Sequence, residues 1–262
     1  MHKLIYILLL LATITVTSQN YTLEKVNEVT IEADTFIGVD TFNALYHIKD
    51  DVLYKGDIND GYQFTALQLG AITSVDILNP LKISVFYEAT NTTVILDNTL
   101  SEITRINFSA IDDFRNISHV ATNGDRRLWV FNTDLQQLEI FDWNTDQITT
   151  QFPPMPVNAT TLATNFNFAW VVNEIGLFHY NNYGSFLSKT ALQDITLISQ
   201  SKGAVILLSQ GKLHYKPKES NDFIALDTPD FTIKQLSLNG EILYLYTGQK
   251  LAAFRLKLPK KP

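Results

Sequence analysis

The chain has 262 residues, of which 45% are apolar and 18% are charged, a balance typical of a globular protein rather than a disordered one. Its formal net charge of −7 and the lack of a basic stripe disfavour binding to nucleic acid or to anionic lipid. Cysteine is absent, which excludes disulfides, thiolate nucleophiles, thiolate metal ligands and lipid attachment through an N-terminal cysteine.

The first residues have the pattern of a secretory signal peptide. A short basic start, Met1–Lys3, precedes an apolar run over residues 4–16. We expect cleavage after Ser18, so that residues 1–18 are the signal peptide and the mature protein is exported, to the periplasm or the cell exterior. A transmembrane anchor is the alternative, but a span needs about 20 apolar residues and this run is shorter. No second run of that length follows, so we expect no transmembrane segment or lipid anchor in the mature chain.

Short β-strands make up the rest of the chain. Apolar runs rich in Ile, Val, Leu, Phe and Tyr alternate with clusters of Asn, Asp, Gly, Ser and Thr. The first run, Val26–Glu32, alternates apolar and polar residues. The clearest unit lies in the middle of the chain, where tight turns join four runs that are predicted to pair as antiparallel strands. These runs are 117–122, 128–132, 138–142 and 148–152.

The four-stranded unit recurs at intervals typical of a β-propeller. One apolar residue in the first strand of each unit recurs every 35 to 45 residues, at Ile37, Val75, Val120, Leu162, Leu197 and Leu236. Evenly spaced units of this kind predict an all-β, six-bladed β-propeller, in which each unit is one blade. We expect residues 19–262 to form a single domain with blades at 35–70, 71–109, 110–156, 157–192, 193–229 and 230–258.

The last unit is one strand short, because the chain ends after three predicted strands. A propeller must close its ring, since an open sheet edge is a liability. We therefore predict that Val26–Glu32 supplies the outer strand of the final blade.

The runs Leu128–Asn132 (LWVFN) and Leu138–Asp142 (LEIFD) show the unit most clearly. In this pattern, over nearly all of the mature chain, the sequence resembles the broad group of secreted β-propellers with degenerate repeats of the YVTN or quinoprotein-like type. It is also similar to uncharacterised exported propellers of diderm bacteria. Both groups are defined by a scaffold pattern, so the resemblance implies a fold and assigns no catalytic residue.

Polar residues near the predicted central channel are the first candidates for a binding site. The inner strands are mainly Thr, Ser, Ile and Leu, and their polar exceptions are Asp40, Asp76, His119 and Asn123. A metal centre needs converging ligands, and the spacing of the histidines does not provide them. His179 and His214 lie on third strands, where we expect them to face the blade surface. We therefore predict neither a metal site nor a cofactor.

Two other features are candidates for contact with a partner. Asp112 and Asp113, followed by Arg115, precede the inner strand of the third blade, on the side where inter-blade loops surround the channel mouth. Adjacent carboxylates point in different directions and make a poor general acid–base pair. The remaining interpretations are a charged loop exposed to solvent or a polar contact to a ligand. Trp143 begins a turn, and an exposed tryptophan can anchor a partner.

The sequence contains neither a nucleophile elbow nor a phosphate-binding loop. We therefore expect a non-enzymatic module of the cell envelope that binds another envelope protein, a peptide or a surface polymer. It would be a monomer or a subunit of a larger envelope assembly. The alternative is a propeller enzyme, such as a lactonase-like hydrolase or a sugar dehydrogenase, with polar side chains converging on an active site at the channel mouth.

Overall fold

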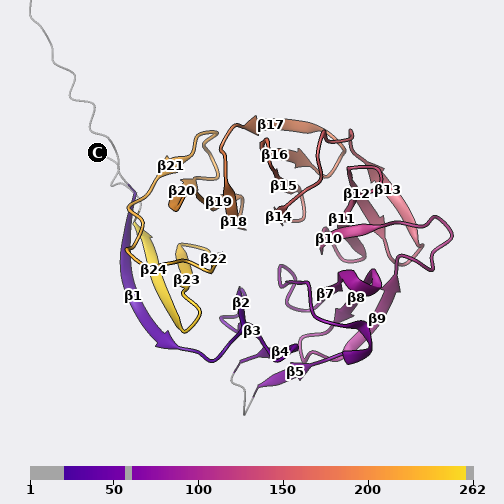
Figure 1. Ribbon diagram of the computed structural model, residues 1–262, viewed down its shortest axis with the longest axis horizontal. Helices are drawn as coiled ribbons and strands as arrows, with labels where there is room; N and C mark the ends of the chain where they lie inside the picture. Colours follow the sequence, from indigo (N-terminus) through magenta and orange to yellow (C-terminus); the bar gives the residue numbers. More distant parts are fainter. Residues whose placement is uncertain (1–20, 57–60, 258–262) are drawn as a thin grey trace, which may run out of the picture.

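The computed structural model describes residues 21–56 and 61–257, and the predicted signal peptide lies outside these ranges. The described chain forms six four-stranded antiparallel sheets. The sheets are arranged as blades around a central axis (Figure 1). The predicted all-β, six-bladed propeller, with its last blade completed by an N-terminal strand, is confirmed.

In blades 1 to 5 the strands follow one another in chain order from the channel to the rim. Blades 1 to 3 consist of β2 (Thr35–Val39), β3 (Leu45–Lys49), β4 (Val52–Lys55) and β5 (Tyr62–Phe64); β6 (Ser74–Asp76), β7 (Ile83–Tyr87), β8 (Thr92–Leu96) and β9 (Glu102–Asn107); and β10 (Ile117–Thr122), β11 (Arg127–Asn132), β12 (Gln137–Asp142) and β13 (Gln147–Gln151). Blades 4 to 6 consist of β14 (Thr161–Thr164), β15 (Phe168–Asn173), β16 (Gly176–Asn181) and β17 (Phe186–Thr190); β18 (Ile195–Ser201), β19 (Ala204–Ser209), β20 (Lys212–Lys216) and β21 (Ile224–Ala225); and β22 (Gln235–Asn239), β23 (Ile242–Tyr246) and β24 (Lys250–Lys257) with β1 (Thr22–Thr30) outermost.

Helical structure in the described ranges is confined to two short 3₁₀ turns, η1 (Leu67–Leu69) and η2 (Glu88–Thr90). No helix among these residues has the length and apolar character needed to span a membrane.

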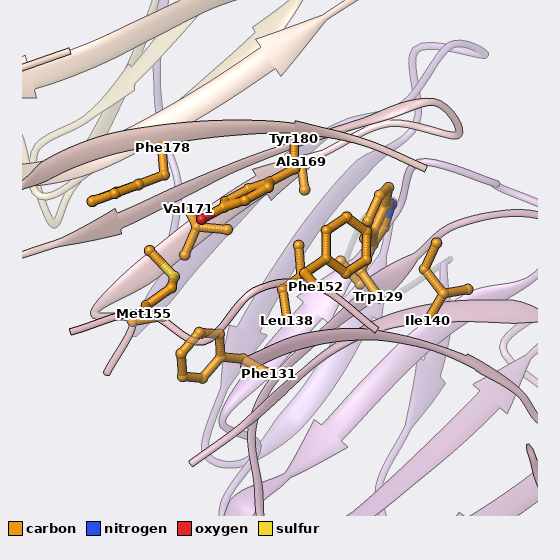
Figure 2. Close-up of a cluster of buried hydrophobic side chains, with 12 residues drawn as sticks. Trp129, Phe131, Leu138, Ile140, Phe152, Met155, Ala169, Val171, Phe178 and Tyr180 are labelled. Carbon is orange, nitrogen blue, oxygen red and sulfur yellow. The ribbon is translucent and has the colours of Figure 1, made fainter. Parts of the chain in front are cut away.

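The hydrophobic core is divided into six layers, one between each pair of neighbouring blades. Successive side chains of a strand point to opposite faces, so Val130 of β11 packs toward blade 2 while Trp129 packs toward blade 4. Both faces of the middle strands are therefore buried, which explains their continuous apolar runs. In the layer between blades 3 and 4, the ring of Phe152 lies 5.6 Å from those of both Trp129 and Tyr180. Figure 2 shows side chains of the two blades meeting in this layer.

The two faces of the ring carry different turns. The first and third strands of each blade end on the same side, which we call the hairpin face, at turns such as Asp40–Asn43 and Trp143–Asp146. The opposite side, which we call the connection face, carries the links between blades and turns such as Thr133–Gln136.

The layer that closes the ring, between blades 6 and 1, is thinly packed. It has four buried residues, whereas the layer between blades 3 and 4 has twelve. The inner strands approach closely here: a Cβ on Gly38 of β2 would lie 2.7 Å from the Ser237 Oγ of β22, so a larger residue would require the serine side chain to move. The Tyr246 hydroxyl donates to the Ala33 carbonyl oxygen at 2.6 Å and adds one polar link across the junction.

Strand pairing therefore supplies much of the closure. β1 pairs antiparallel with β24 from Thr22 opposite Lys257 to Thr30 opposite Lys250. Figure 1 shows β1 running along the outside of the last blade. The prediction that an N-terminal strand completes this blade is confirmed, but its limits of Val26–Glu32 were wrong. β1 is exposed along nearly its whole length, so apolar alternation is a poor guide to where it begins and ends.

We predict that Leu23→Asp opens the closing strand. Leu23 is the partly buried residue of β1 and packs on the layer between blades 5 and 6. A carboxylate there is expected to lower the free energy of unfolding by about 2 kcal/mol in urea titrations. Exposure of the β24 edge should also promote self-association on gel filtration. Val26→Asp on the same strand is the control, since Val26 is 49% exposed and should change little. Equal effects of the two substitutions would contradict the role of Leu23.

Candidate functional site

A cavity of about 830 Å³ runs along the central axis and opens at the hairpin face. Residues from all six inner strands line it, and most of them are Ile, Val, Leu, Ala, Ser or Thr. Its mouth is formed by hairpin-face turns that include Thr41, Asn167 and Gly203. A cavity of this volume is within the range of small-molecule and peptide side-chain sites.

The two predicted carboxylates at the channel are held by hydrogen bonds within the protein. Asp40 accepts from the backbone N–H of Phe42 and Ala44 at 2.8 and 2.9 Å and from the Tyr46 hydroxyl at 3.0 Å. Asp76 accepts from the Leu78 N–H at 2.7 Å and, across the blade junction, from the Thr122 N–H at 2.5 Å. Burial raises the pKa of Asp76, although both N–H donors act to lower it. These carboxylates order turns and join blades.

His119 and Asn123 also bridge neighbouring blades. His119 lines the cavity, and its Nδ1 lies 2.8 Å from the Ser118 hydroxyl. Burial lowers the pKa of His119, against a hydrogen bond to the Thr160 backbone in the next blade that raises it. Asn123 is 1% exposed, and its side-chain N–H donates to the Phe166 carbonyl oxygen of blade 4 at 3.3 Å.

Arg115 belongs to a buried cluster on the connection face, away from the mouth of the cavity. Its Nε donates to Glu139 Oε2 at 3.0 Å, and the two side chains are 7% and 0% exposed. Glu139 also accepts from the side-chain amide of Gln151 at 3.2 Å. Asp113, 76% exposed, covers the outer side of the guanidinium, and Asp112 is an exposed neighbour. The placement of Asp112, Asp113 and Arg115 beside the channel mouth was therefore wrong, because the cavity opens at the other face.

Trp143 lies on the hairpin face, in the turn after β12. It is half-buried against the layer between blades 2 and 3, and the Lys82 ammonium lies 5.6 Å from its ring centroid. Lys82 is also paired with Asp125 at 2.5 Å. The indole is thus partly covered by a neighbouring blade.

At one corner the cavity extends between blades 4 and 5. We call this extension the corner pocket, and its walls are Trp170 and His179 from blade 4 and Lys216, Lys218 and Asn221 from blade 5. The His179 ring stacks on the Trp170 ring with centroids 4.8 Å apart and an interplanar angle of 9°.

The titratable groups of the corner pocket are perturbed by burial. Burial, with a contribution from the nearby Lys216 charge, lowers the pKa of His179 to about 4, so the ring is neutral at pH 7. Burial also lowers the pKa of the Lys216 ammonium. The Nε2 of His179 and the Nε1 of Trp170 are buried and have no hydrogen-bond partner among the residues that the structure describes.

Sequence reasoning did not find the corner pocket. We expected His179 to face the blade surface, and this was wrong, because it lies in the wall of the cavity. Aligning the repeats would have given a signal: His179 lies opposite Trp170 on the neighbouring strand, at the position where Ile140 lies opposite Trp129 in blade 3. A polar residue thus replaces an apolar one at an inter-blade position.

Within residues 21–56 and 61–257, no three His, Asp or Glu side chains are grouped so as to hold a metal ion. The residues brought together at the corner pocket are suited to polar and aromatic recognition.

Neither a protein-family model nor a curated protein sequence matches the chain. The YVTN or quinoprotein-like assignment therefore stays a prediction.

Solved structures share the propeller fold. Virginiamycin B lyase from Staphylococcus aureus superposes with a TM-score of 0.63 at 11% identity, covering 91% of this chain and 100% of the lyase chain. BamB from Moraxella catarrhalis gives a TM-score of 0.52 at 12% identity, covering 91% and 82%. PorZ of Porphyromonas gingivalis, a surface component of the type-IX secretion system, gives 0.53 at 12% identity, covering 90% and 39%. At these identities the likeness shows the fold alone.

We predict that Arg115→Met destabilises the protein strongly, because it leaves the Glu139 carboxylate buried without its counter-charge. The loss should be about 3–5 kcal/mol in the free energy of unfolding, measured by urea denaturation. The double variant Arg115→Met/Glu139→Met should recover most of this loss, since both charges are removed together. A double variant no more stable than the single one would contradict this account of the cluster.

We also predict an acid-sensitive contribution from His179. Its pKa is about 4 in the folded protein, below the 6.5 of an unperturbed histidine, so as pH falls from 6.5 toward 4 the unfolded state takes up the proton and stability is lost. His179→Phe keeps a ring stacked on Trp170. Between pH 7 and pH 4.5, the free energy of unfolding of this variant should fall by about 1 kcal/mol less than that of the wild type. His214→Phe, on the third strand of the next blade, should flatten the pH dependence less. Identical pH dependences in wild type and His179→Phe would contradict the prediction.

Proposed function

We propose that this chain is an exported, non-enzymatic binding module of the cell envelope, which holds a partner protein, a peptide or a surface polymer on its hairpin face. The observation that carries the proposal is the mouth of the central cavity. Phe166, 44% exposed, lines the cavity, and other hairpin-face turns carry Phe42, Leu81 and Tyr183, which are 71%, 58% and 86% exposed. Exposed aromatic side chains beside a concavity are typical anchors of a protein interface.

The chemistry at the channel supports binding more than catalysis. A general acid or base needs a carboxyl group or an imidazole free to exchange a proton with a substrate. The carboxylates of Asp40 and Asp76 are instead bound to backbone N–H groups, and His119 is held by Ser118. The remaining inner wall is largely apolar or carries hydroxyl groups.

The placement in the envelope has independent support. The apolar run before Ser18 has the composition of a cleaved signal peptide. Among the proteins of similar fold, PorZ is a surface component of a bacterial secretion system. The hairpin face of this chain offers both a cavity and exposed apolar side chains.

A cross-linking capture from intact native cells tests this proposal. The tagged wild-type protein should be found in the envelope fraction with Gln19 as its first residue, and it should recover a reproducible partner. The triple variant Phe42→Asp/Phe166→Asp/Tyr183→Asp should reduce that recovery about tenfold or more, because it removes the apolar anchors.

The matched control is Leu67→Asp/Leu135→Asp/Ile175→Asp, which alters residues of the connection face that are 75%, 47% and 40% exposed. This variant should retain the partner. Recovery lost only in the connection-face variant would place the partner on the wrong face, and an uncleaved protein in the cytoplasm would overturn the envelope location.

A further inference from the structure

Two tryptophans occupy the same position in neighbouring blades but differ in their hydrogen bonding. Trp129 and Trp170 are each the third residue of their blade's second strand, β11 and β15. The Trp129 Nε1 donates to the Asn165 carbonyl oxygen in the first turn of the next blade, at 3.0 Å. Trp170 is also buried, at 2% exposure against 0% for Trp129, yet its Nε1 has no acceptor among the described residues. Because an unpaired buried N–H is unfavourable, an acceptor arriving in the corner pocket would be stabilised there.

The opposite wall of the corner pocket carries a buried ammonium group. Tyr180 lies opposite Ala169, the second residue of β15, and Lys216 lies opposite Val205, the second residue of β19. The two positions are therefore equivalent, and a lysine in blade 5 replaces an aromatic ring that fills the preceding inter-blade layer.

Lys216 lacks a charged partner within the described part of the chain. The residue is 8% exposed, and its Nζ donates to the Ser220 carbonyl oxygen at 2.9 Å. No described carboxylate lies within ion-pair distance of it. A buried cation of this kind favours an anion that can reach it from the pocket.

Aromatic rings form the floor beside these two donors. His179 stacks on Trp170, and the Phe168 ring centroid lies 6.0 Å from that of Trp170. His179 presents a buried Nε2 that is unpaired among the described residues. The corner pocket thus combines two hydrogen-bond donors, one of them the Lys216 ammonium, with the flat surface of the stacked rings.

The charge of the corner pocket points to a carboxylate. Lys202 and Lys218 add exposed positive charge at its mouth, in a protein whose net charge is −7, and Lys218 reaches only the exposed Glu219 at 3.9 Å. Phosphate sites usually gather several strong donors, arginine above all, and the described lining contains no arginine. The Lys216 ammonium supplies one positive charge for the single negative charge of a carboxylate. Together with the Trp170 N–H, it also supplies one donor for each of the two carboxylate oxygens.

We propose that the corner pocket binds a carboxylate carried beside an aromatic side chain, as at the C-terminus of a partner chain. Lys216 and the Trp170 N–H bind the carboxylate, and the aromatic floor takes the side chain. The inference rests on the proposed function in taking the hairpin face as the binding face. Its test uses a small probe, so its outcome is separate from whether a protein partner is captured.

The probe is N-acetyl-phenylalanine, titrated into ¹⁵N-labelled protein of residues 19–262 and followed by the indole N–H resonances of its three tryptophans. Trp170→Phe assigns the Trp170 signal. That signal should move downfield and saturate with a Kd on the order of 1 mM, while the signals of Trp129 and Trp143 stay in place. N-acetyl-phenylalanine amide, which has the ring without the carboxylate, should leave the Trp170 signal unmoved.

Lys216→Met should weaken binding of the probe about tenfold, because it removes the charge and keeps the length of the side chain. Lys212→Met is the matched control on the same strand, since Lys212 is exposed and lies outside the cavity lining. It should leave the Kd within about twofold. The dispersion of the amide spectrum shows that both variants are folded.

Two further probes separate the sources of the anion. N-acetyl-aspartate α-amide carries a side-chain carboxylate without a ring, and it should bind more weakly than the first probe. Inorganic phosphate should bind more weakly still. Equal shifts with the neutral amide, preference for phosphate, or no movement of the Trp170 signal would overturn the proposal, and tighter binding of the aspartate derivative would overturn the assignment to a chain terminus.

Discussion

The antiparallel pairing of β1 with β24 is the contact on which the rest of this structure depends. Each blade buries its faces only against two neighbours, so opening the ring would expose one face of blade 6 and one face of blade 1. At the closing junction the packing is thin, with four buried residues including Phe36 and Tyr246, and the hydrogen bonds of β1 make up for it. The cavity and its mouth exist because that ring holds the six inner strands around one axis.

Much of this architecture could be predicted from the sequence, because equivalent strands of successive blades place apolar residues at regular intervals along the chain. Leu162 and Leu197, for example, are landmarks of inner strands β14 and β18, which hold equivalent places in successive blades. Strands buried on both faces read as apolar runs and are easily located. β1 was misplaced by several residues since its side chains are nearly all exposed, and its limits are set by pairing with β24 instead of by burial.

The site was harder to predict, because a polar residue in a sequence does not reveal whether its partners are internal. Asp40 and Asp76 stood out as polar residues at the channel, yet their carboxylates accept hydrogen bonds from nearby backbone N–H groups. The residues of the corner pocket were overlooked because Trp170 belongs to an apolar run typical of a buried strand. Lys216, in turn, cannot be distinguished in the sequence from an exposed surface lysine. Only the register of neighbouring blades shows that His179 and Lys216 occupy positions filled elsewhere by Ile140 and Tyr180.

The pairing of β1 with β24 also determines how the molecule responds to mechanical force. Thr22 lies opposite Lys257, so the two ends of the described chain leave the rim side by side. Inter-strand hydrogen bonds of an antiparallel pair run perpendicular to the strands. Tension applied between these ends therefore loads the bonds one at a time and peels the strand away. The strand that closes the ring is thus the part of the propeller that yields first when its two ends are pulled apart.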